Sequence, residues 1–326
     1  MNLAGIVDAV VEAPVVPSFT RLGFDLRSRF EHWRALDDYD LSGRTVLLTG
    51  ATSGLGLAAA EQLARSGAEV ILLGRDQAKT ARVRDELASR TGNETLRTAI
   101  ADMGDLDAIR RAARTVLADG RPLHALLHNA GTLSAERATS AQGTEATVAS
   151  QVVGPFLLTS LLLPLLRATG PSRVLTMASG GMYAAALTVD RLEMSGATYR
   201  GSEQYARAKR AQVTLNEMWA QRVPKSDVVF HALHPGWADT PGVEASLPTF
   251  RRLLGPALRT PAQGADTLVW LTADDAAPLA STGGFWLDRR RRPIHRLPTT
   301  RRSDTPERRE ELWRWCCEKA GIDPFA

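Results

Sequence analysis

The stretch that decides the fold runs from Arg44 to Gly56 and reads RTVLLTGATSGLG. The residues that follow Arg44 are apolar or β-branched, so that residues 44–49 predict a buried strand, and residues 54–66 predict a helix. A turn that joins a strand to a helix N-terminus presents unpaired backbone N–H groups and a positive dipole end, and both favour a bound phosphate. We therefore predict a nucleotide-phosphate loop at this turn. Its binding residues are Gly50, Thr52, Ser53, Gly54, Leu55 and Gly56.

Each glycine of this loop has a separate physical use. Gly50 permits the tight turn, Gly54 lets the backbone approach a pyrophosphate, and Gly56 lets the helix pack on the strand. The spacing is Gly-x-x-x-Gly-x-Gly rather than Gly-x-Gly-x-x-Gly. A glycine triplet alone is weak evidence, but this one ends the first strand of a long alternating series.

That series continues for about 250 residues. Apolar runs at 69–73, 95–100, 123–128, 173–177 and 228–233 predict strands, and residues 76–90, 106–118, 142–168 and 202–223 predict helices. Strands that alternate with helices indicate an α/β fold with a doubly wound parallel sheet and helices on both faces. We assign residues 42–290 to this one domain, and the 44% hydrophobic content supplies its core.

Two segments flank the predicted domain. Residues 1–41 form an N-terminal extension, in which residues 19–36 mix aromatic residues and leucines with arginines. This pattern predicts an amphipathic helix that lies on the domain or, alternatively, makes peripheral contact with a membrane. Residues 291–326 form a polar C-terminal tail with a helix near 307–317, preceded by Thr305 and docked by Trp313.

Arginines cluster where the domain meets this tail, at 289–292 and again at 296, 301 and 302. The simpler interpretation is a solvated, arginine-rich segment. The alternative is a contact surface for acidic lipid, a partner or a ligand phosphate. The net charge of +4 is small for 326 residues and does not suggest a nucleic-acid partner.

Cysteine usage and the N-terminus bear on the compartment. Cys316 and Cys317 are adjacent and no metal-ligand spacing surrounds them, so a reducing, cytoplasmic setting without a metal site is expected. The N-terminal apolar stretch contains Asp8 and Glu12, unlike a secretory signal. The apolar run at 152–166 is shorter than the roughly 20 residues of a membrane span, and predicts a core or subunit-interface helix.

The second strand ends in Leu73-Gly74-Arg75-Asp76. A carboxylate at this point would bind the ribose hydroxyls of NAD, whereas an arginine fork would bind the 2′-phosphate of NADP. Arg75 therefore favours NADP(H). NAD(H) stays possible because Asp76 is adjacent, although Asp76 can serve simply as a helix cap.

Tyr205 and Lys209 lie four residues apart in a predicted helix and so share one face. A nearby ammonium and a positive nicotinamide ring would lower the phenol pKa from about 10. The phenol could then exchange a proton with a carbonyl or alcohol oxygen, while Lys209 could also hold the nicotinamide ribose. Such a pair also arises by chance, as a core tyrosine with a snorkelling lysine.

Ser179 follows the fifth strand in the sequence Met177-Ala-Ser-Gly-Gly181. The carboxyl edge of a parallel sheet is where ligands bind in such folds. Ser179 is therefore the candidate for a second hydrogen bond to a substrate carbonyl, the alternative being a simple turn serine.

Five motifs occur in an order that resembles the short-chain dehydrogenase/reductase superfamily. They are TGATSGLG at 49–56, Asn129-Ala130-Gly131, Ser179, YARAK at 205–209 and His234-Pro235-Gly236. Over residues 42–290 the resemblance implies a Rossmann-like sheet of about seven strands and a homo-oligomer built through two long helices. It also implies further cofactor contacts, which are Asp102 at the adenine, Asn129, Ala130 and Gly131, and Pro235, Gly236 and Thr240 near the nicotinamide.

The resemblance extends to smaller groups within the superfamily, and this chain departs from the family pattern at one position. The long Ser179–Tyr205 interval is similar to that of the retinol-dehydrogenase and WW-domain oxidoreductase group. The blocks at 18–21, 234–237 and 285–289 are similar to the dehydrogenase/reductase member twelve group. Where the family carries an asparagine that holds a proton-relay water, this chain has Gln151, which we assign to the catalytic set with the same amide on a longer arm.

These features together predict an NADP(H)-dependent enzyme that interconverts a carbonyl and an alcohol on a small molecule. The alternative is a nucleotide-binding redox sensor or scaffold with little catalysis, which Gln151 and the two extensions would suit. A lipophilic substrate such as a retinoid, steroid or fatty aldehyde fits the residues expected near the pocket. Those residues are Leu187, Leu192, Met194, Tyr199, Val243, Leu247 and Phe250.

Overall fold

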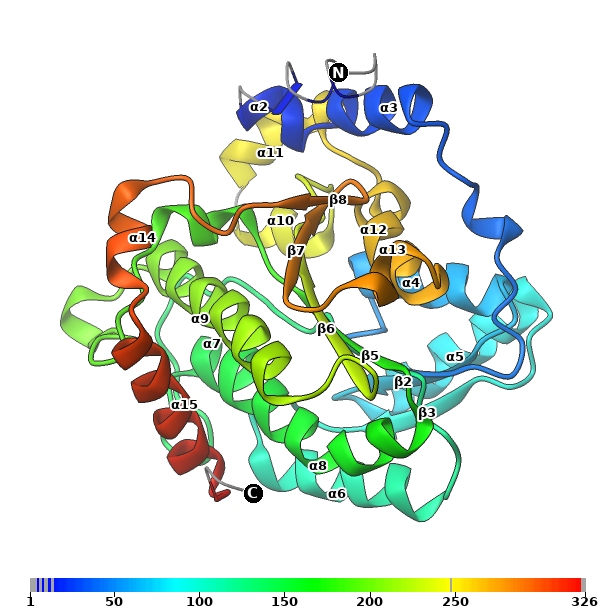
Figure 1. The fold of residues 1–326 in the computed structure, drawn as a ribbon, viewed down its shortest axis with the longest axis horizontal. Coiled ribbons are helices and arrows are strands. Elements are labelled where there is room, and N and C mark those ends of the chain that lie inside the picture. Colours follow the sequence, from blue (N-terminus) through cyan, green and yellow to red (C-terminus); the bar gives the residue numbers. More distant parts are fainter. Residues whose placement is uncertain (1–4, 6–7, 9–10, 13–14, 247, 324–326) are drawn as a thin grey trace.

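An eight-stranded sheet forms the centre of the computed structural model, which describes residues 5, 8, 11–12, 15–246 and 248–323 (Figure 1). The strand order is β3-β2-β1-β4-β5-β6-β7-β8, and every neighbouring pair is parallel except β7 and β8. The strands are β1 (Thr45–Thr49), β2 (Glu69–Gly74), β3 (Arg97–Ile100), β4 (Ala125–His128), β5 (Ser172–Met177), β6 (Val228–Leu233), β7 (Gly284–Leu287) and β8 (Arg290–Arg292). The predicted doubly wound α/β fold is confirmed, with one strand more than expected.

Helices cover both faces of this sheet (Figure 1). One face carries α6 (Leu106–Ala118), α8 (Gly154–Thr169) and α9 (Gly201–Arg222), and the other carries α4 (Gly54–Arg65), α5 (Gln77–Thr91) and α12 (Pro261–Ala273). Side chains alternate between the two cores, so that Leu126 packs in the first and Leu127 in the second. A strand buried on both faces is apolar along its whole length, which explains the continuous apolar runs in the sequence.

The sheet order places the switch point between β1 and β4. Strand β1 pairs with β2 on one side and with β4 on the other, so successive crossovers leave β1 in opposite directions. The loops that follow these two strands therefore diverge at the carboxyl edge, and a crevice of this kind is where doubly wound folds bind ligands.

The arginine cluster is solvated only in part: Arg291, Arg301 and Arg302 are exposed, whereas the others form ion pairs. Residues 290–292 form β8 and pair antiparallel with β7, inside the region predicted to be a polar tail. Arg289 pairs with Asp266 at 2.7 Å and Arg292 with Asp8 at 2.6 Å. The carboxylates that neutralise these arginines are remote in sequence, which is why the local charge pattern gave the wrong interpretation.

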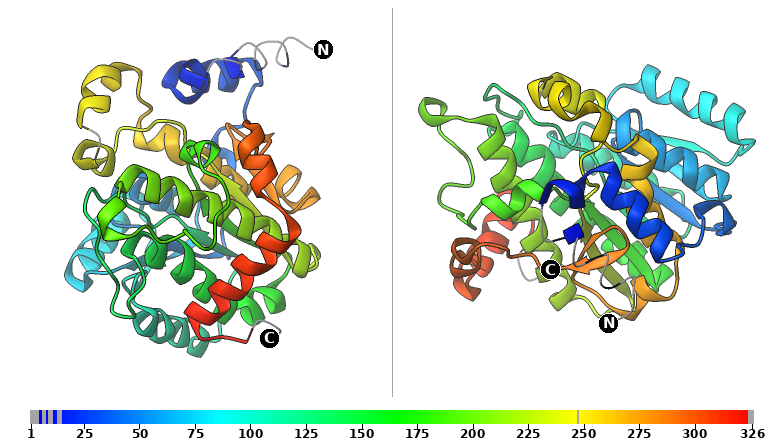
Figure 2. Two further views of the ribbon diagram at one scale, coloured as in Figure 1. Left: turned by 90° about the vertical axis from the view of Figure 1, so that its left-hand side faces the viewer. Right: turned by 90° about the horizontal axis from the view of Figure 1, so that it is seen from above.

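The N-terminal extension lies against the end of the sheet near β7 and β8 (Figures 1 and 2). It forms α2 (Val15–Phe19), α3 (Arg21–Phe30) and a short 3₁₀ turn, η1 (Leu36–Asp38). The helix predicted over 19–36 thus ends at Phe30. Its Arg27 is buried and pairs with Asp288 at 2.6 Å, so α3 is attached to the domain by an internal ion pair.

The C-terminal segment forms α14 (Pro298–Ser303) and α15 (Pro306–Ala320). Thr305 caps α15 by accepting from the Arg308 N–H, and the Trp313 ring lies 4.9 Å from Phe156 and 4.7 Å from Trp219. Helix α15 therefore packs on α8 and α9, the two helices expected to form a subunit interface. The buried thiols of Cys316 and Cys317 belong to this contact and are not bonded to each other.

A helical stretch at Ala146–Thr169 is long and apolar enough to cross a membrane, judged by length and composition within the described residues. About 67% of it is buried inside the fold, as in the core helix of a globular domain. It comprises α7 (Ala146–Val148), a π-helical turn η2 (Ala149–Val153) and α8. The remaining short elements are η3 (Gly180–Ala184), η4 (Gly196–Thr198), α10 (Pro241–Ser246), α11 (Pro248–Leu254), η5 (Gly255–Ala257) and α13 (Ala277–Ala280).

Candidate active site

The predicted phosphate loop is a close-packed turn between β1 and α4. Gly50 and Gly54 have φ values of +67° and +53°, in the left-handed region that favours glycine. A Cβ atom on Gly56 would overlap the Gly50 carbonyl oxygen. The three glycines therefore leave bare backbone facing the crevice at the N-terminus of α4, which suits a pyrophosphate.

Asn129 holds the loop after β4 to the phosphate loop. Its side-chain amide donates to the carbonyl oxygens of Thr49 at 3.1 Å and Gly50 at 3.3 Å. The Thr49 hydroxyl accepts from the backbone N–H groups of Asn129 and Ala130, both at 3.0 Å. Gly50 also packs on Ala130, with 2.8 Å between a hypothetical Cβ and the Ala130 Cα. Thr49, which the sequence reasoning did not single out, thus aligns the two sides of the crevice.

The tip of β2 lies beside the phosphate loop. A Cβ atom on Gly74 would lie 3.1 Å from the Thr52 side chain. Asp76 caps α5 by accepting from the Lys79 N–H at 2.8 Å. Arg75 is exposed, and its guanidinium has no hydrogen bond or ion pair to any described residue. The carboxylate is therefore occupied in the helix cap, while the arginine is available to an anion.

Asp102 follows β3 at the same edge of the sheet. Its carboxylate accepts from the Gly104 N–H at 2.8 Å and so closes a turn. Asp102 thus has a local role in this loop, and the adenine contact implied by the resemblance stays a prediction.

The predicted catalytic residues meet at the carboxyl end of β5. Ser179 precedes η3 and accepts from the Gly181 N–H at 3.3 Å, and its hydroxyl lies close enough to the Tyr205 phenol to lower the pKa of that phenol. Lys209 is buried one turn further along α9, where its ammonium donates to the Met177 carbonyl oxygen at 2.9 Å. Two neighbouring elements, β5 and α9, therefore bring together three residues that span thirty positions of sequence.

Burial sets the acid–base properties of this pair. It raises the pKa of Tyr205 to about 12, against the opposing effect of the Ser179 hydrogen bond. It lowers the pKa of Lys209 to about 7. The expectation that Lys209 depresses the phenol pKa is therefore wrong for the chain alone, because removing a phenolate from water costs more than its neighbours return. Tyr205 is protonated at neutral pH.

Gln151 lies in the π-helical turn η2, a local distortion that is frequent at functional sites. Its side-chain N–H donates to the Thr132 carbonyl oxygen at 2.7 Å. A Cβ atom on Gly131 would lie 2.9 Å from Gln151 Oε1 and 3.4 Å from Lys209 Nζ. The amide oxygen and the ammonium thus face the same point, and that oxygen has no partner among the described residues. Gln151 is placed to accept a hydrogen bond near Lys209.

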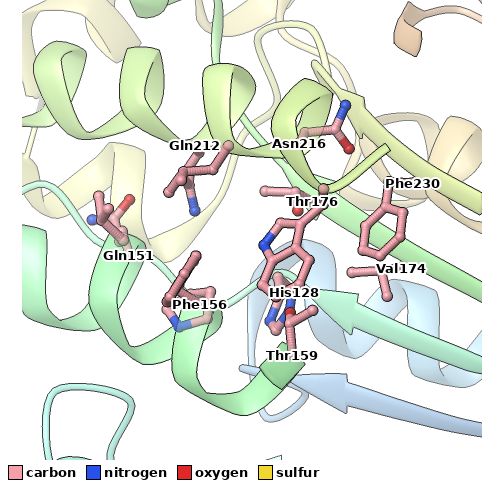
Figure 3. Close-up of a pocket in the computed structure, with 13 residues that line it drawn as sticks. His128, Gln151, Phe156, Thr159, Val174, Thr176, Gln212, Asn216 and Phe230 are labelled. Atoms are coloured by element: carbon pink, nitrogen blue, oxygen red, sulfur yellow. The ribbon is translucent and has the colours of Figure 1, made fainter. Parts of the chain in front are cut away.

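A cavity of about 30 Å³ lies beside Gln151, between β4, β5, α8 and α9 (Figure 3). Most of its lining is apolar, but His128, Gln212 and Asn216 also line it, and His128 Nδ1, Gln212 Oε1 and Asn216 Nδ2 have no partner among the described residues. Its size and these unpaired polar atoms suit one or two water molecules. The sequence carried no signal of this cavity, since its polar residues come from five separate elements, β4, η2, α8, β5 and α9.

The loop after β6 closes the opposite side of the crevice. Gly236 has φ +74°, and the Pro235 carbonyl oxygen accepts from Arg259 Nη1 at 3.3 Å. A Cβ atom on Gly54 would lie 3.4 Å from the Thr240 Cβ, so this loop reaches the phosphate loop. Arg259, which the sequence reasoning missed, lies under the loop and shapes it.

Part of the predicted pocket lining is wrong. Leu187 and Leu192 belong to the core cluster beneath α8 and α9, and Met194 is also buried. The reason is Gln204, whose side chain bonds the Met194 N–H at 2.7 Å and the Leu192 carbonyl at 2.8 Å, so the segment folds back onto α9. Of the other residues predicted to line the pocket, Tyr199 donates a hydrogen bond to Glu145. Val243 lies on α10 and Phe250 on α11. Leu247 lies outside the described residues.

Known proteins are similar to this chain in sequence and in fold. A family model described as short chain dehydrogenase matches residues 44–249. Human dehydrogenase/reductase SDR family member 12 is 37% identical over 275 residues, which is 84% of this chain and 86% of the human protein. Bovine retinol dehydrogenase 12 is 32% identical over 288 residues, 87% of this chain and 89% of the bovine protein. A short chain dehydrogenase from Escherichia coli CFT073, solved in complex with NADPH, has a TM-score of 0.64 and 25% identity, covering 79% of this chain and all of the other.

Proposed function

The chain belongs to the short-chain dehydrogenase/reductase family of oxidoreductases, which act on alcohol and carbonyl groups, and from this premise we propose its reaction. We propose NADP(H)-dependent interconversion of a carbonyl and an alcohol on a lipophilic small molecule. The observation that carries the proposal is the grouping of Ser179 and Tyr205 with the buried Lys209, whose ammonium lies 5.2 Å from the centre of the Tyr205 ring, at the same sheet edge as the phosphate loop.

The residues at this edge fit a dinucleotide. Bare backbone at Gly50 and Gly56 offers room for the pyrophosphate, and the N-terminus of α4 offers N–H donors. The exposed guanidinium of Arg75 supports NADP(H) over NAD(H), because it suits a 2′-phosphate and has no protein partner among the described residues. When bound, the nicotinamide supplies or takes up the hydride.

The protein supplies the proton and orients the carbonyl. A protonated Tyr205 phenol can donate to the oxygen of a carbonyl substrate, and the Ser179 hydroxyl can add a second hydrogen bond. The Lys209 ammonium lies beside the phenol, where it can return a proton to it, and the Gln151 amide oxygen can hold a water molecule on that path by accepting its hydrogen bond.

Apolar aromatic side chains support a lipophilic substrate. Trp237, in the loop after β6, packs edge-on against Phe250 of α11 with 5.2 Å between ring centres. Both lie on the segment that follows His234 and closes the nicotinamide side. The similarity to a retinol dehydrogenase points to the same chemical class.

The decisive experiment is an assay of NADPH oxidation against a panel of aldehydes and ketones. We expect Tyr205→Phe to lower kcat/KM at least about a hundredfold, since proton transfer by a positioned group typically contributes that much. Tyr39→Phe is the matched control, because Tyr39 bonds Asp274 away from the crevice. A redox sensor or scaffold would instead bind NADPH tightly, with turnover equally low in all three proteins.

Peripheral membrane contact is a second, narrower proposal. Leu22 of α3 and Leu253 of α11 are 56% and 73% exposed, and both helices lie at the upper end of the molecule in Figure 1. Exposed apolar residues beside arginines suit a membrane surface. We expect Leu22→Ser with Leu253→Ser to reduce sedimentation with anionic vesicles, and equal sedimentation of variant and parent would remove the proposal.

A further inference from the structure

We propose that the N-terminal segment is a positioning element of the active site, in which Phe19 holds the Ser179 loop and the Pro235 loop together. The inference rests on the proposed function, because it assigns that segment a role in shaping the same site. It also gives the N-terminal extension a use other than covering the domain or touching a membrane.

Phe19 lies directly beneath the residue that follows the catalytic serine. A Cβ atom on Gly180 would lie 2.8 Å from Phe19 Cε2 and 2.9 Å from His234 Nε2. The Phe19 ring is buried and stands edge-on to His234, with 4.4 Å between ring centres, and also packs on Trp237 at 5.6 Å. One side chain from the N-terminal segment therefore contacts the chain immediately after β5 and immediately after β6.

Backbone hydrogen bonds make the second of these contacts specific. The Trp237 N–H donates to the Phe19 carbonyl oxygen at 2.7 Å, and Arg259 Nε donates to the same oxygen at 3.1 Å. Arg259 also bonds the carbonyl oxygen of Pro235, and its guanidinium fills the space where Gly236 would carry a Cβ atom. Residues 235–237 thus take their shape from Phe19 and Arg259.

A buried charge cluster anchors the segment in one register. Asp288, in the turn between β7 and β8, accepts from Arg27 at 2.6 Å and from Arg259 at 2.8 Å. Arg259 donates at 2.9 Å to the Ser18 carbonyl oxygen, and all three charged side chains are almost completely buried. Displacing the segment would break the buried Arg27–Asp288 ion pair and the hydrogen bonds of Arg259 to Ser18 and Phe19, which opposes any sliding of Phe19 relative to the sheet.

The consequence concerns the geometry of catalysis. Ser179 must stay at a fixed distance from the nicotinamide side of the crevice, which residues 235–237 line. Shortening Phe19 would leave a void beneath Gly180 and His234, into which both loops would relax. A displacement of about 1 Å at a catalytic group can lower a rate a hundredfold. Phe19 is thus a positioning residue, and it need not touch the substrate.

The test compares Phe19→Leu with Phe230→Leu, a matched loss of a buried aromatic ring in the middle of β6. Dissociation constants are measured for NADPH and for 2′-phospho-ADP-ribose, which lacks the nicotinamide. We expect Phe19→Leu to weaken NADPH binding at least fivefold, to leave 2′-phospho-ADP-ribose binding within twofold, and to lower kcat/KM at least tenfold. Phe230→Leu should lower Tm without changing the ratio of the two dissociation constants. Equal effects of both variants on this ratio would overturn the inference.

Hydrogen exchange separates this inference from the proposed function. In Phe19→Leu without cofactor, peptides covering residues 178–183 and 234–240 should exchange at least threefold faster, while residues 45–56 stay unchanged. Failure of the unmodified protein to oxidise NADPH with any substrate would remove the proposed reaction and leave this comparison intact. Unchanged exchange in both loops would overturn the positioning role by itself.

Discussion

Lys209 Nζ lies 5.2 Å from the centre of the Tyr205 ring and donates a hydrogen bond of 2.9 Å to the Met177 carbonyl oxygen. Met177 ends β5 and stands two residues before Ser179. Strand β5 therefore holds the Lys209 ammonium through this hydrogen bond and also leads directly to Ser179. Helix α9 carries Tyr205. The relative positions of all three groups depend on one contact between a strand and a helix.

The low pKa of Lys209 makes the reaction pH-dependent near neutrality. Burial brings its pKa from 10.5 to about 7, so the ammonium is lost as the pH rises through that value. We expect reductive kcat/KM to fall up to tenfold per pH unit above the pKa in the cofactor complex. Lys209→Arg keeps its charge and should give a weaker but flat profile between pH 6 and 9. A flat profile for the unmodified protein would contradict this prediction.

Arg75 should decide the choice between NADPH and NADH. Removing one charge-assisted contact to a phosphate costs about 1.5–3 kcal/mol, or roughly 10- to 150-fold. We expect Arg75→Ser to lower kcat/KM for NADPH by that factor and to change the NADH value less than twofold. Arg82→Ser on α5, the helix that follows Arg75, is the control, since Arg82 pairs with Glu86 and faces solvent. Equal losses in both variants would show that Arg75 only adds to the general positive charge.

Gln151 should support proton return to the active site. Its amide oxygen faces the same point as the Lys209 ammonium, beside a cavity that suits water. We expect Gln151→Leu to lower kcat about tenfold with little change in KM, and Gln151→Asn to stay within threefold of the parent. The measurement is steady-state kinetics with the solvent deuterium isotope effect on kcat. An unchanged kcat in Gln151→Leu would exclude the amide from the relay.

Two buried histidines should make the fold sensitive to mild acid. Burial lowers the pKa values of His128 and His234 to about 3 each, whereas the unfolded chain takes up their protons near pH 6.5. Their contribution to stability is fully present above pH 6.5 and is lost as the pH falls toward 3. At pH 5 each should cost about 2 kcal/mol. Thermal denaturation from pH 7.5 to 5 should show this fall in Tm, and His128→Gln should reduce it.

Helix α15 should prevent association through α8 and α9. Its Trp313 packs on Phe156 of α8 and Trp219 of α9, and so covers the face that the family resemblance suggested as a subunit interface. We expect light scattering after gel filtration to give the mass of one chain, or of an assembly built through another face. A dimer in which cross-links join α8 or α9 of the two copies would contradict this expectation.

Most strands of the sheet and the central residues of the site could be predicted from the sequence. The phosphate loop, the end of β2 at Arg75 and the Tyr205–Lys209 spacing are local patterns, read over a few residues. The periodicity of a strand or a helix can be recognised within a short window of sequence, so these elements could be located without a structure. Ser179 followed for the same reason, since it ends a continuous apolar run.

Local pattern could not show what depends on distant partners. The arginines at 289–292 looked solvated because Asp8 and Glu31 lie more than 250 residues away, and Leu187 and Leu192 looked like pocket residues until Gln204 fixed their segment. The pKa values of Tyr205 and Lys209 also follow from burial by the whole fold. The sequence by itself therefore determined the chemistry available at the site. Only the tertiary structure decided its electrostatics and its support by Phe19, because both arise from contacts between segments with no periodic relation along the chain.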